Sequence, residues 1–378
     1  MSFVPSRLER LREALSRFGV DVLCIRKVSN IAWLTGFERV FDEEDAHALF
    51  VTRDRVFLHS DSRYEVALRA AAVGTCVEVD IQRKGHCDLL LSFAEAYCAK
   101  TQDGARVCIG IEDTVSLREY RTLENRCRSA AFDVEVKELD SCIESLREVK
   151  DEAECASMRA AQAITDKAFS VVVSEMKAGM SEREVQLRLD SLMMELGAEG
   201  LAFPTIVATG PNAASPHAQP GDRILEKGHA VVMDFGARYG GYCSDMTRTV
   251  FVGEPSEKMK RAWEALRRAN EECEALIAPG VCAADVNNRA EVILAEAGFE
   301  GKMGHSLGHS VGLDIHEAPA LSPRNAQSLE AGNVVTVEPG IYIEGEFGMR
   351  LEDFGVVTQD GFQVFTKSKH DMVIIDNR

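Results

Sequence analysis

The first part of the chain alternates between apolar residues at helical spacing and short, continuous apolar runs. Leu8, Leu11 and Leu15 lie on one face of a helix that ends before Gly19, and the apolar run 20–25 predicts a strand. Further strands are expected at 48–52, 55–59, 77–81, 107–111 and 132–136, and further helices at 64–72, 88–99 and 116–128. This alternation predicts an α/β domain that ends near residue 145.

Residues 146–378 carry a longer pattern that occurs twice. Each copy consists of two helices followed by a pair of strands. In the first copy, the capping box of Ser181 and Glu184 begins the second helix and Gly197 ends it. The helices are expected at 151–178, 182–196, 256–277 and 284–297, and the strands at 229–237, 242–252, 333–344 and 348–358. This repeat predicts an α+β domain with pseudo-twofold symmetry.

Composition and charge narrow the class of protein. A length of 378 residues, at about 150 residues per domain, predicts two or three domains. With 46% hydrophobic residues, 28% charged residues and 10 prolines, the chain is typical of a globular protein. The net charge of −18 argues against nucleic acid and against an anionic membrane as partners, because like charges repel.

The cysteines and the start of the chain bear on the compartment. The eleven cysteines are odd in number and include no CxxC pair, so neither a disulfide framework nor a zinc knuckle is indicated. The first residues lack the basic and apolar segments of a secretion signal, and no apolar run is long enough to span a membrane. We therefore expect a reduced, cytoplasmic protein.

Two aspartates stand in apolar segments that the pattern assigns to strands. If Tyr239 and Gly240 form a two-residue hairpin loop, Asp234 lies directly opposite Asp245. Like charges at opposed positions destabilise a strand pair, and aspartate is a poor strand former. Two facing aspartates therefore indicate a cation between them.

Two glutamates repeat this arrangement in the second strand pair. A hairpin centred on Gly345 would place Glu338 opposite Glu352, unless a bulge shifts the register by one residue. Each acid alone has a structural explanation, such as an ion pair with Arg350. Four acids in two matched hairpins nevertheless favour a site for divalent cations.

A histidine cluster between these hairpins could supply a nitrogen ligand. His305, His309 and His316 are three of the nine histidines in the chain, and they fall within twelve residues among repeated glycines. Glycine permits close backbone approach at such a place. The glycine spacing does not match the GxGxxG loop, so nucleotide binding is disfavoured.

Taken together, these motifs resemble the creatinase and methionine-aminopeptidase superfamily, in its Xaa-Pro dipeptidase and aminopeptidase P branch. The resemblance covers nearly the whole chain. It is carried by the segments 29–37, 61–64, 216–217, 244–249, 305–319, 338–340 and 350–353, together with Asp234. It implies a pita-bread catalytic domain over 146–378, a smaller creatinase- or prolidase-like amino-terminal α/β domain over 1–145, and a homodimer.

The resemblance also implies a site for two divalent metal ions. Asp234 would bind one metal, His309 and Glu338 would bind the other, and Asp245 and Glu352 would bridge both. Four carboxylates balance the charge of two divalent cations. Oxygen ligands with one imidazole favour manganese, with cobalt, iron(II) or zinc as alternatives.

Hydrolysis of the bond between an amino-terminal residue and proline is the reaction that the resemblance implies, in a dipeptide or in a longer peptide. A hydroxide bridging the metals would attack the scissile carbonyl. Glu338 would act as general base, and His217 and His316 would contact the substrate. The substrate pocket would also include His305, Tyr342 and Arg350.

Several alternatives stand beside this interpretation. The same metal centre could support lyase or other non-peptide chemistry, and a scaffold protein could have kept the fold. Arg350 could serve only to neutralise the acids. Ser310 follows the histidine ligand where many relatives have glycine, which bears on substrate preference. Cys243 shares the strand face of Asp245, so oxidation of its thiol could inhibit, although a buried structural thiol is the simpler interpretation.

Overall fold

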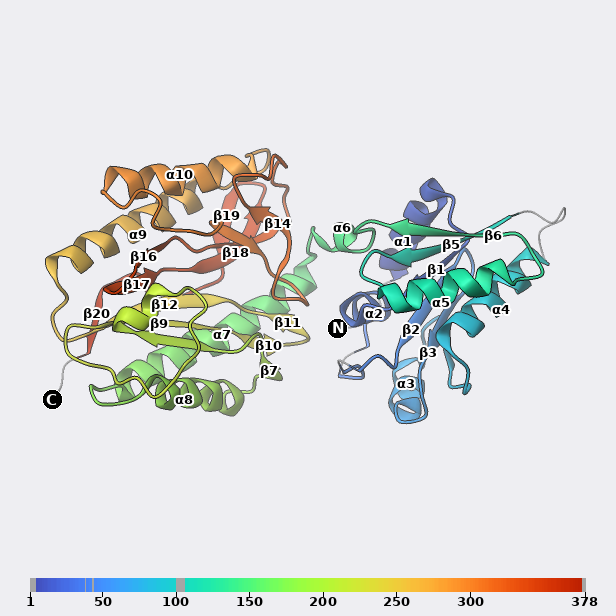
Figure 1. Cartoon of the computed structure of the whole chain (residues 1–378), viewed down its shortest axis with the longest axis horizontal. Helices are drawn as coiled ribbons and strands as arrows, with labels where there is room; N and C mark the ends of the chain where they lie inside the picture. Colours follow the sequence, from blue (N-terminus) through green and yellow to red (C-terminus); the bar gives the residue numbers. More distant parts are fainter. Residues whose placement is uncertain (1–4, 38, 43, 100–105, 376–378) are drawn as a thin grey trace. The chain divides into compact units, whose positions relative to one another are not determined.

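The computed structural model describes residues 5–37, 39–42, 44–99 and 106–375. The chain divides into two compact units, Met1–Arg147 and Glu148–Arg378 (Figure 1). Within the described ranges, no helix combines the length and the apolar character needed to cross a membrane.

The first unit is built on one six-stranded sheet with the strand order β4-β3-β2-β1-β5-β6. β2 pairs antiparallel with β1 and β3, and the other neighbours are parallel. The strands are β1 (Val22–Ile25), β2 (Ala48–Thr52), β3 (Val56–His59), β4 (Val77–Asp80), β5 (Val107–Glu112) and β6 (Val134–Leu139). The helices are α1 (Pro5–Phe18), α2 (Val28–Thr35), α3 (Glu65–Ala71), α4 (His86–Cys98), α5 (Leu117–Arg128) and α6 (Glu144–Arg147). The expected α/β class is confirmed; α2 and α6, which were not predicted, are too short to produce a helical pattern.

The second unit contains the predicted repeat, and its two helix pairs enclose the strands between them (Figure 1). The first half consists of α7 (Glu152–Glu175), α8 (Glu182–Glu195), β9 (Ala230–Phe235), β10 (Ala237–Tyr239), β11 (Tyr242–Cys243) and β12 (Met246–Val252). The second half consists of α9 (Glu257–Leu276), α10 (Ala283–Glu296), β15 (Val334–Val337), β16 (Gly340–Ile343), β17 (Phe347–Arg350) and β18 (Asp353–Thr358). The capping box of Ser181 and Glu184 begins α8, as predicted.

Short elements that the sequence pattern did not predict complete this unit. They are β7 (Gly200–Leu201), β8 (Ile206–Thr209), η1 (Gly210–Ala214), β13 (Gly308–Ser310), β14 (Glu317–Leu321), β19 (Gly361–Val364) and β20 (Val373–Ile375). Elements of two to five residues are too short to show a period of their own.

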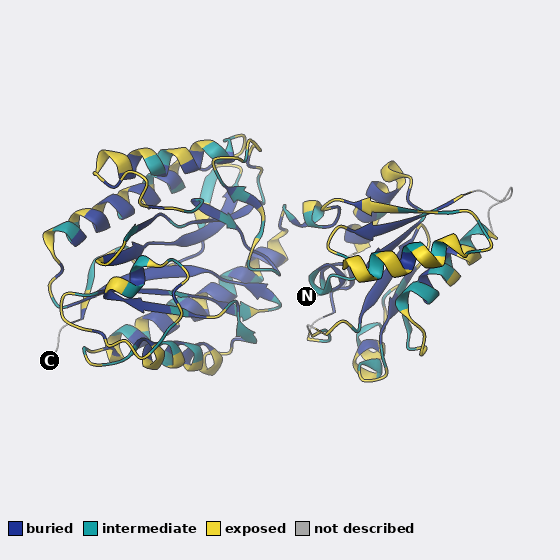
Figure 2. Ribbon diagram, in the orientation of Figure 1, coloured by how far each residue is buried: buried dark blue, intermediate teal, exposed yellow. Residues whose placement is uncertain are grey.

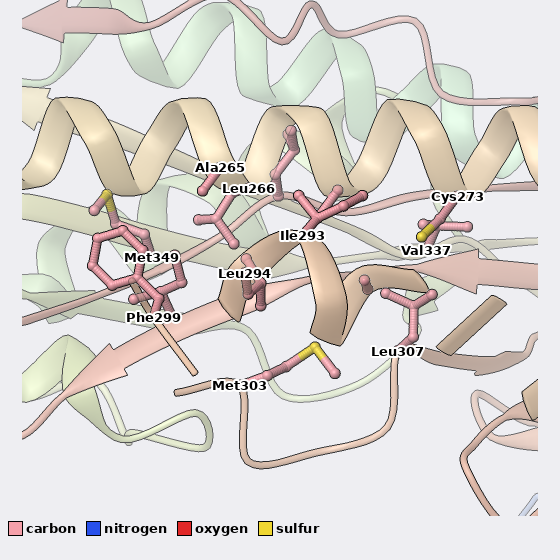
Figure 3. Packing of buried hydrophobic residues seen from close by; sticks show 14 of the residues in the cluster. Ala265, Leu266, Cys273, Ile293, Leu294, Phe299, Met303, Leu307, Val337 and Met349 are labelled. Carbon is pink, nitrogen blue, oxygen red and sulfur yellow. The ribbon is translucent and has the colours of Figure 1, made fainter. Parts of the chain in front are cut away.

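The helices of the second unit bury their inner faces and expose their outer faces (Figure 2). In the second half, Leu266 from α9 and Ile293 and Leu294 from α10 share one core with Val337 and Met349 from the strands (Figure 3). All five side chains are completely buried. Because Val337 and Met349 each lie beside functional candidates in the sequence, this core fixes the backbone of the predicted site.

The first hairpin turns one residue later than predicted. Gly240 and Gly241 form its loop with φ angles of 59° and 79°, so that Tyr239 pairs with Tyr242. A type I′ turn needs a positive φ at both central residues, which glycine adopts without strain and tyrosine does not. The two-glycine loop is therefore the better turn.

This turn changes the position of the two aspartates. Asp234 pairs with Thr247, so the expected direct opposition of Asp234 and Asp245 is wrong. Asp245 is two residues before Thr247, and side chains alternate along a strand. The two aspartates are therefore diagonal neighbours on one face of the ribbon.

The second hairpin has the predicted register. Gly340 pairs with Arg350 across a turn centred on Gly345, which has a φ angle of 74°. β15 and β18 continue the same register beyond Glu338 and Glu352. The two glutamates therefore occupy opposed positions where the ribbon passes from one strand pair to the next.

The tight contact of β17 with η1 can be tested at a glycine. A Cβ atom at Gly348 would overlap the backbone carbonyl of Ala213, whereas a Cβ at Gly345 would meet open space. We expect Gly348→Ala to destabilise the second unit by about 1–3 kcal/mol, or roughly 2–12 °C in Tm. The control Gly345→Asn should cost less, because asparagine tolerates the left-handed region. Equal Tm values for the two variants in thermal melts would contradict this packing argument.

Candidate metal centre

Five side chains that lie in or directly beside separate strands converge on one cavity of about 770 Å³ in the second unit. These residues are the predicted ligands. Asp234 lies in β9, Asp245 directly before β12, His309 in β13, Glu338 directly after β15 and Glu352 directly before β18. The structure thus brings together residues that are up to 118 positions apart in the sequence.

The distances at the centre of this cluster suit a shared ion. Asp245, His309 and Glu352 each offer one ligand atom, and these three atoms lie within 4.8 Å of one another. His309 Nε2 is 3.6 Å from Asp245 Oδ2 and 3.5 Å from Glu338 Oε1. The imidazole therefore lies between carboxylates from both hairpins.

Hydrogen bonds from neighbouring residues hold the predicted ligands in place. His309 Nδ1 donates to the backbone carbonyl of Ser310 at 3.1 Å, which leaves Nε2 free for a cation. The Thr247 hydroxyl donates to Glu352 Oε2 at 2.7 Å and accepts from Arg350 Nε at 2.9 Å. Such contacts fix the orientation of a ligand before any metal binds.

Two carboxylate oxygens of the cluster lack the partners that a bound cation would supply. Asp234 Oδ1 and Asp245 Oδ1 are buried and have no hydrogen-bond partner among the described residues. A buried carboxylate oxygen without a partner loses its hydration and gains nothing in return. A divalent cation would supply the missing interaction, and oxygen ligands with one imidazole suit such an ion.

Electrostatics at the site lead to the same conclusion. Burial, followed by the charge of neighbouring carboxylates, raises the pKa of Asp245 and of Glu352 well above their ordinary values. Burial also raises the pKa of Glu338 to about 8, and it lowers the pKa of His309 to about 4. Without cations, the carboxylates cannot all be ionised at neutral pH, while the imidazole is already neutral and able to bind a metal.

The remaining predicted residues lie in the cavity lining or, in the case of Tyr342, next to it. His217, His305 and His316 line the cavity, and the rings of His309 and His316 contact each other with centroids 4.4 Å apart. Arg350 donates to Asp234 and, at 2.7 Å, to the Tyr342 hydroxyl. The geometry thus shows Arg350 neutralising an acid, while Tyr342 reaches the site through Arg350.

Two side chains singled out in the sequence lie elsewhere. The Ser310 side chain is fully buried, lies outside the cavity lining and accepts a hydrogen bond from Lys150, so the expected link to substrate preference through direct contact finds no support. Cys243 is fully buried, and burial raises the pKa of its thiol to about 11. A protonated, inaccessible thiol favours the structural interpretation over sensitivity to oxidation.

Several residues at the site were not predicted from the sequence. Thr247 and Thr336 donate to carboxylates of the cluster, and Arg183 and Gln186 bring α8 to the cavity. Thr247 lies in the segment 244–249 that carries the family resemblance, but no local motif marks the other three, because each becomes relevant only through the packing of distant strands and helices. The threonines could have been suspected from their positions beside the acids.

Comparisons with known proteins agree with this geometry. The model of metallopeptidase family M24 matches residues 156–359, and the creatinase/prolidase N-terminal domain matches residues 7–149. The chain is 31% identical to an Xaa-Pro dipeptidase of Pyrococcus horikoshii over 99% of this chain and 100% of that protein. It is similar to the structure of an Xaa-Pro dipeptidase from Bacillus anthracis, with 33% identity, a TM-score of 0.88 and coverage of 98% and 99%. It is also similar to an X-Pro aminopeptidase from Thermotoga maritima, with 33% identity, a TM-score of 0.85 and coverage of 97% and 99%.

Removal of metal should make stability strongly dependent on pH. Asp245, Glu338 and Glu352 have raised pKa values in the metal-free fold, so they hold protons that the unfolded chain has lost. Stability of the metal-free protein should therefore fall as pH rises from 6.5 to 8.5, by on the order of 1.4 kcal/mol per pH unit for each retained proton. The lowered pKa values of His305 and His309 oppose this fall only weakly and mainly near pH 6.5, where the imidazoles of the unfolded chain lose their remaining protons.

Thermal melts of chelator-treated and Mn²⁺-loaded protein across this pH range would measure the effect. The loaded protein should show a smaller pH dependence, because bound cations keep these three carboxylates ionised, whereas Glu274, whose pKa burial raises to about 8, contributes equally to both forms. Parallel curves for both forms, with loss of metal verified, would contradict the electrostatic argument.

Proposed function

The chain belongs to metallopeptidase family M24, and from this membership and the geometry of the cavity we propose a two-cation centre that hydrolyses Xaa-Pro bonds. Membership itself makes the chain a metallopeptidase that uses divalent metal ions. The observation that carries the finer proposal is the convergence of four carboxylates and one imidazole, with two buried oxygens that accept no hydrogen bond from any residue the structure describes.

The proposed ligand assignment is the one that the family resemblance implies, and the measured distances around His309 are compatible with it. Asp234 would hold one cation, and His309 with Glu338 would hold the other. Asp245 and Glu352 would bridge both cations, which agrees with their position beside His309 and with their strongly raised pKa values. The four carboxylates then balance two divalent charges, and the donor set suits manganese, cobalt or iron(II).

Each side chain at the site would have a separate role in hydrolysis. Bound cations would lower the pKa of a water molecule and polarise the scissile carbonyl. Glu338, which has one carboxylate oxygen 3.5 Å from His309 Nε2, would accept the proton that this water gives up. His217 and His316 would donate hydrogen bonds to the peptide from the cavity lining, and Arg350 would stay paired with Asp234.

The cavity lining supports a substrate with proline at its second position. Phe203, Pro204, Ile206, Pro216 and Pro220 form an apolar part of the lining. A proline ring is apolar and its amide nitrogen carries no proton to satisfy, so such a surface can accept it without a polar partner. Both the dipeptidase and the aminopeptidase among the similar structures are named for X-Pro substrates, so the proposal includes dipeptides and longer peptides.

A substrate series would test this proposal directly. We expect the Mn²⁺-loaded protein to release the first residue from at least one Xaa-Pro substrate. The dipeptides Gly-Pro and Ala-Pro test dipeptidase activity, and Ala-Pro-Ala tests aminopeptidase activity. Ala-Ala, which lacks proline, should stay largely intact. The ratio of kcat/KM for Ala-Pro and Ala-Pro-Ala would measure the preference for length. If none of these peptides is cleaved by protein that contains metal, the proposed reaction is wrong and non-peptide chemistry becomes the better hypothesis.

Substitution of the proposed base gives a second test. Glu338→Gln should reduce kcat by about 10²–10⁴-fold, because general-base catalysis contributes a factor of that size. Glu344→Gln is a matched control, since Glu344 is exposed at the turn of the same hairpin. Metal content should be measured for both variants. Near-normal kcat in a metal-loaded Glu338→Gln variant would contradict the role of this residue as the base.

A further inference from the structure

Lys150 is a buried cation outside the set of residues discussed for the reaction. It lies just before α7, and its side chain is only 1% exposed. Its ammonium donates to the Ser310 hydroxyl at 2.8 Å and to Glu317 Oε2 at 3.1 Å. A buried charge is tolerated only with close partners, so these contacts hold all three side chains in fixed positions.

The two acceptors of this ammonium each follow a histidine of the cavity. Ser310 comes directly after His309 and accepts from the imidazole Nδ1 through its backbone carbonyl. Glu317 comes directly after His316, and its other carboxylate oxygen accepts from the Asp314 amide at 3.1 Å. One ammonium therefore restrains the chain on the far side of both imidazoles, whose rings contact each other.

Lys150 is itself anchored to the strand that leads to Glu338. Its amide donates to the Gly332 carbonyl at 2.8 Å, and Val149 forms a β-bridge with Asn333 directly before β15. At the other end of β15, the Thr336 hydroxyl accepts from the His309 amide at 3.0 Å. The lysine thus connects the strand of Glu338 to the β13–β14 ribbon that carries the histidines.

We propose that Lys150 is a positioning residue that fixes His309 and His316 through Ser310 and Glu317. The inference rests on the proposed function in one respect, that His309 is a metal ligand. Without the ammonium, the Glu317 carboxylate and the Ser310 hydroxyl each lose the contact that ties them to Lys150, so the ribbon relaxes and the His309 ring turns away from the carboxylates. The Ser310 hydroxyl is part of this linkage because it accepts a hydrogen bond from the Lys150 ammonium. Glycine at this position would offer the ammonium no side-chain acceptor.

The test uses Co²⁺ as a probe of the imidazole ligand. Metal-free wild type, Lys150→Met, Ser310→Ala and the double variant would be titrated with Co²⁺ by calorimetry, and visible absorption spectra of the complexes compared. We expect Lys150→Met to weaken Co²⁺ binding by about 10–100-fold, as for other residues that orient metal ligands, and to change the absorption bands. Ser310→Ala should act in the same direction with a smaller effect. The double variant should lose no more Co²⁺ affinity than Lys150→Met alone, because both substitutions remove the same hydrogen bond between Lys150 and Ser310.

Lys167→Met provides the matched control, since Lys167 is exposed on α7, and it should bind Co²⁺ as the wild type does. If Lys150→Met fails to fold, Ser310→Ala decides the matter, because it leaves the buried ion pair intact. Variants that fold and keep the affinity and spectrum of the wild type would overturn the inference while leaving the proposed function in place. A wild type that binds no Co²⁺ would overturn both.

Discussion

Repulsion among four carboxylates gathered around one cavity is the constraint on which the rest of the second unit depends. Burial removes the water that would otherwise screen these charges, and the raised pKa values of Asp245, Glu338 and Glu352 express the resulting cost. Arg350 offsets part of that cost at Asp234. Divalent cations are the natural compensation for the remainder, so the fold and the metal centre stabilise each other.

Such a site requires a rigid frame, because relaxed carboxylates would move apart. The two hairpins provide it by joining through side chains and backbone. The Glu352 amide donates to the Thr247 carbonyl at 3.1 Å, and the Thr249 hydroxyl donates to the Arg350 carbonyl at 3.0 Å. Thr247 then links Glu352 to Arg350. Each half of the repeat contributes acids, and neither half alone contains the complete set of proposed ligands.

The imidazole comes from a third element, the β13–β14 ribbon, which is too short to be stable alone. A hydrogen bond from the His309 amide to the Thr336 hydroxyl holds this ribbon against β15. Hydrogen bonds from the Lys150 ammonium to Ser310 and Glu317 hold it on its other side. The catalytic proposal and the proposed role of Lys150 therefore depend on one physical idea. Ligands are useful only when their neighbours hold them in one orientation.

The sequence by itself determined the repeated order of helices and strands, the identity of the acids and the histidine cluster, and the register of the second hairpin. Hydrophobic period and residue chemistry are local properties, and a turn centred on Gly345 leaves little freedom in pairing. The first hairpin shows the limit of that reasoning. Moving its loop by one residue, to Gly240 and Gly241, changed the partner of Asp234 from Asp245 to Thr247.

Only the tertiary structure decided how these parts meet. It placed Arg350 against Asp234, directed Ser310 toward Lys150 and away from the cavity lining, and buried Cys243 completely. It also created the short strands β13 and β14, which have no period of their own. These features depend on contacts between residues far apart in the chain, and no local pattern of hydrophobicity or charge encodes which distant side chain will fill a given space.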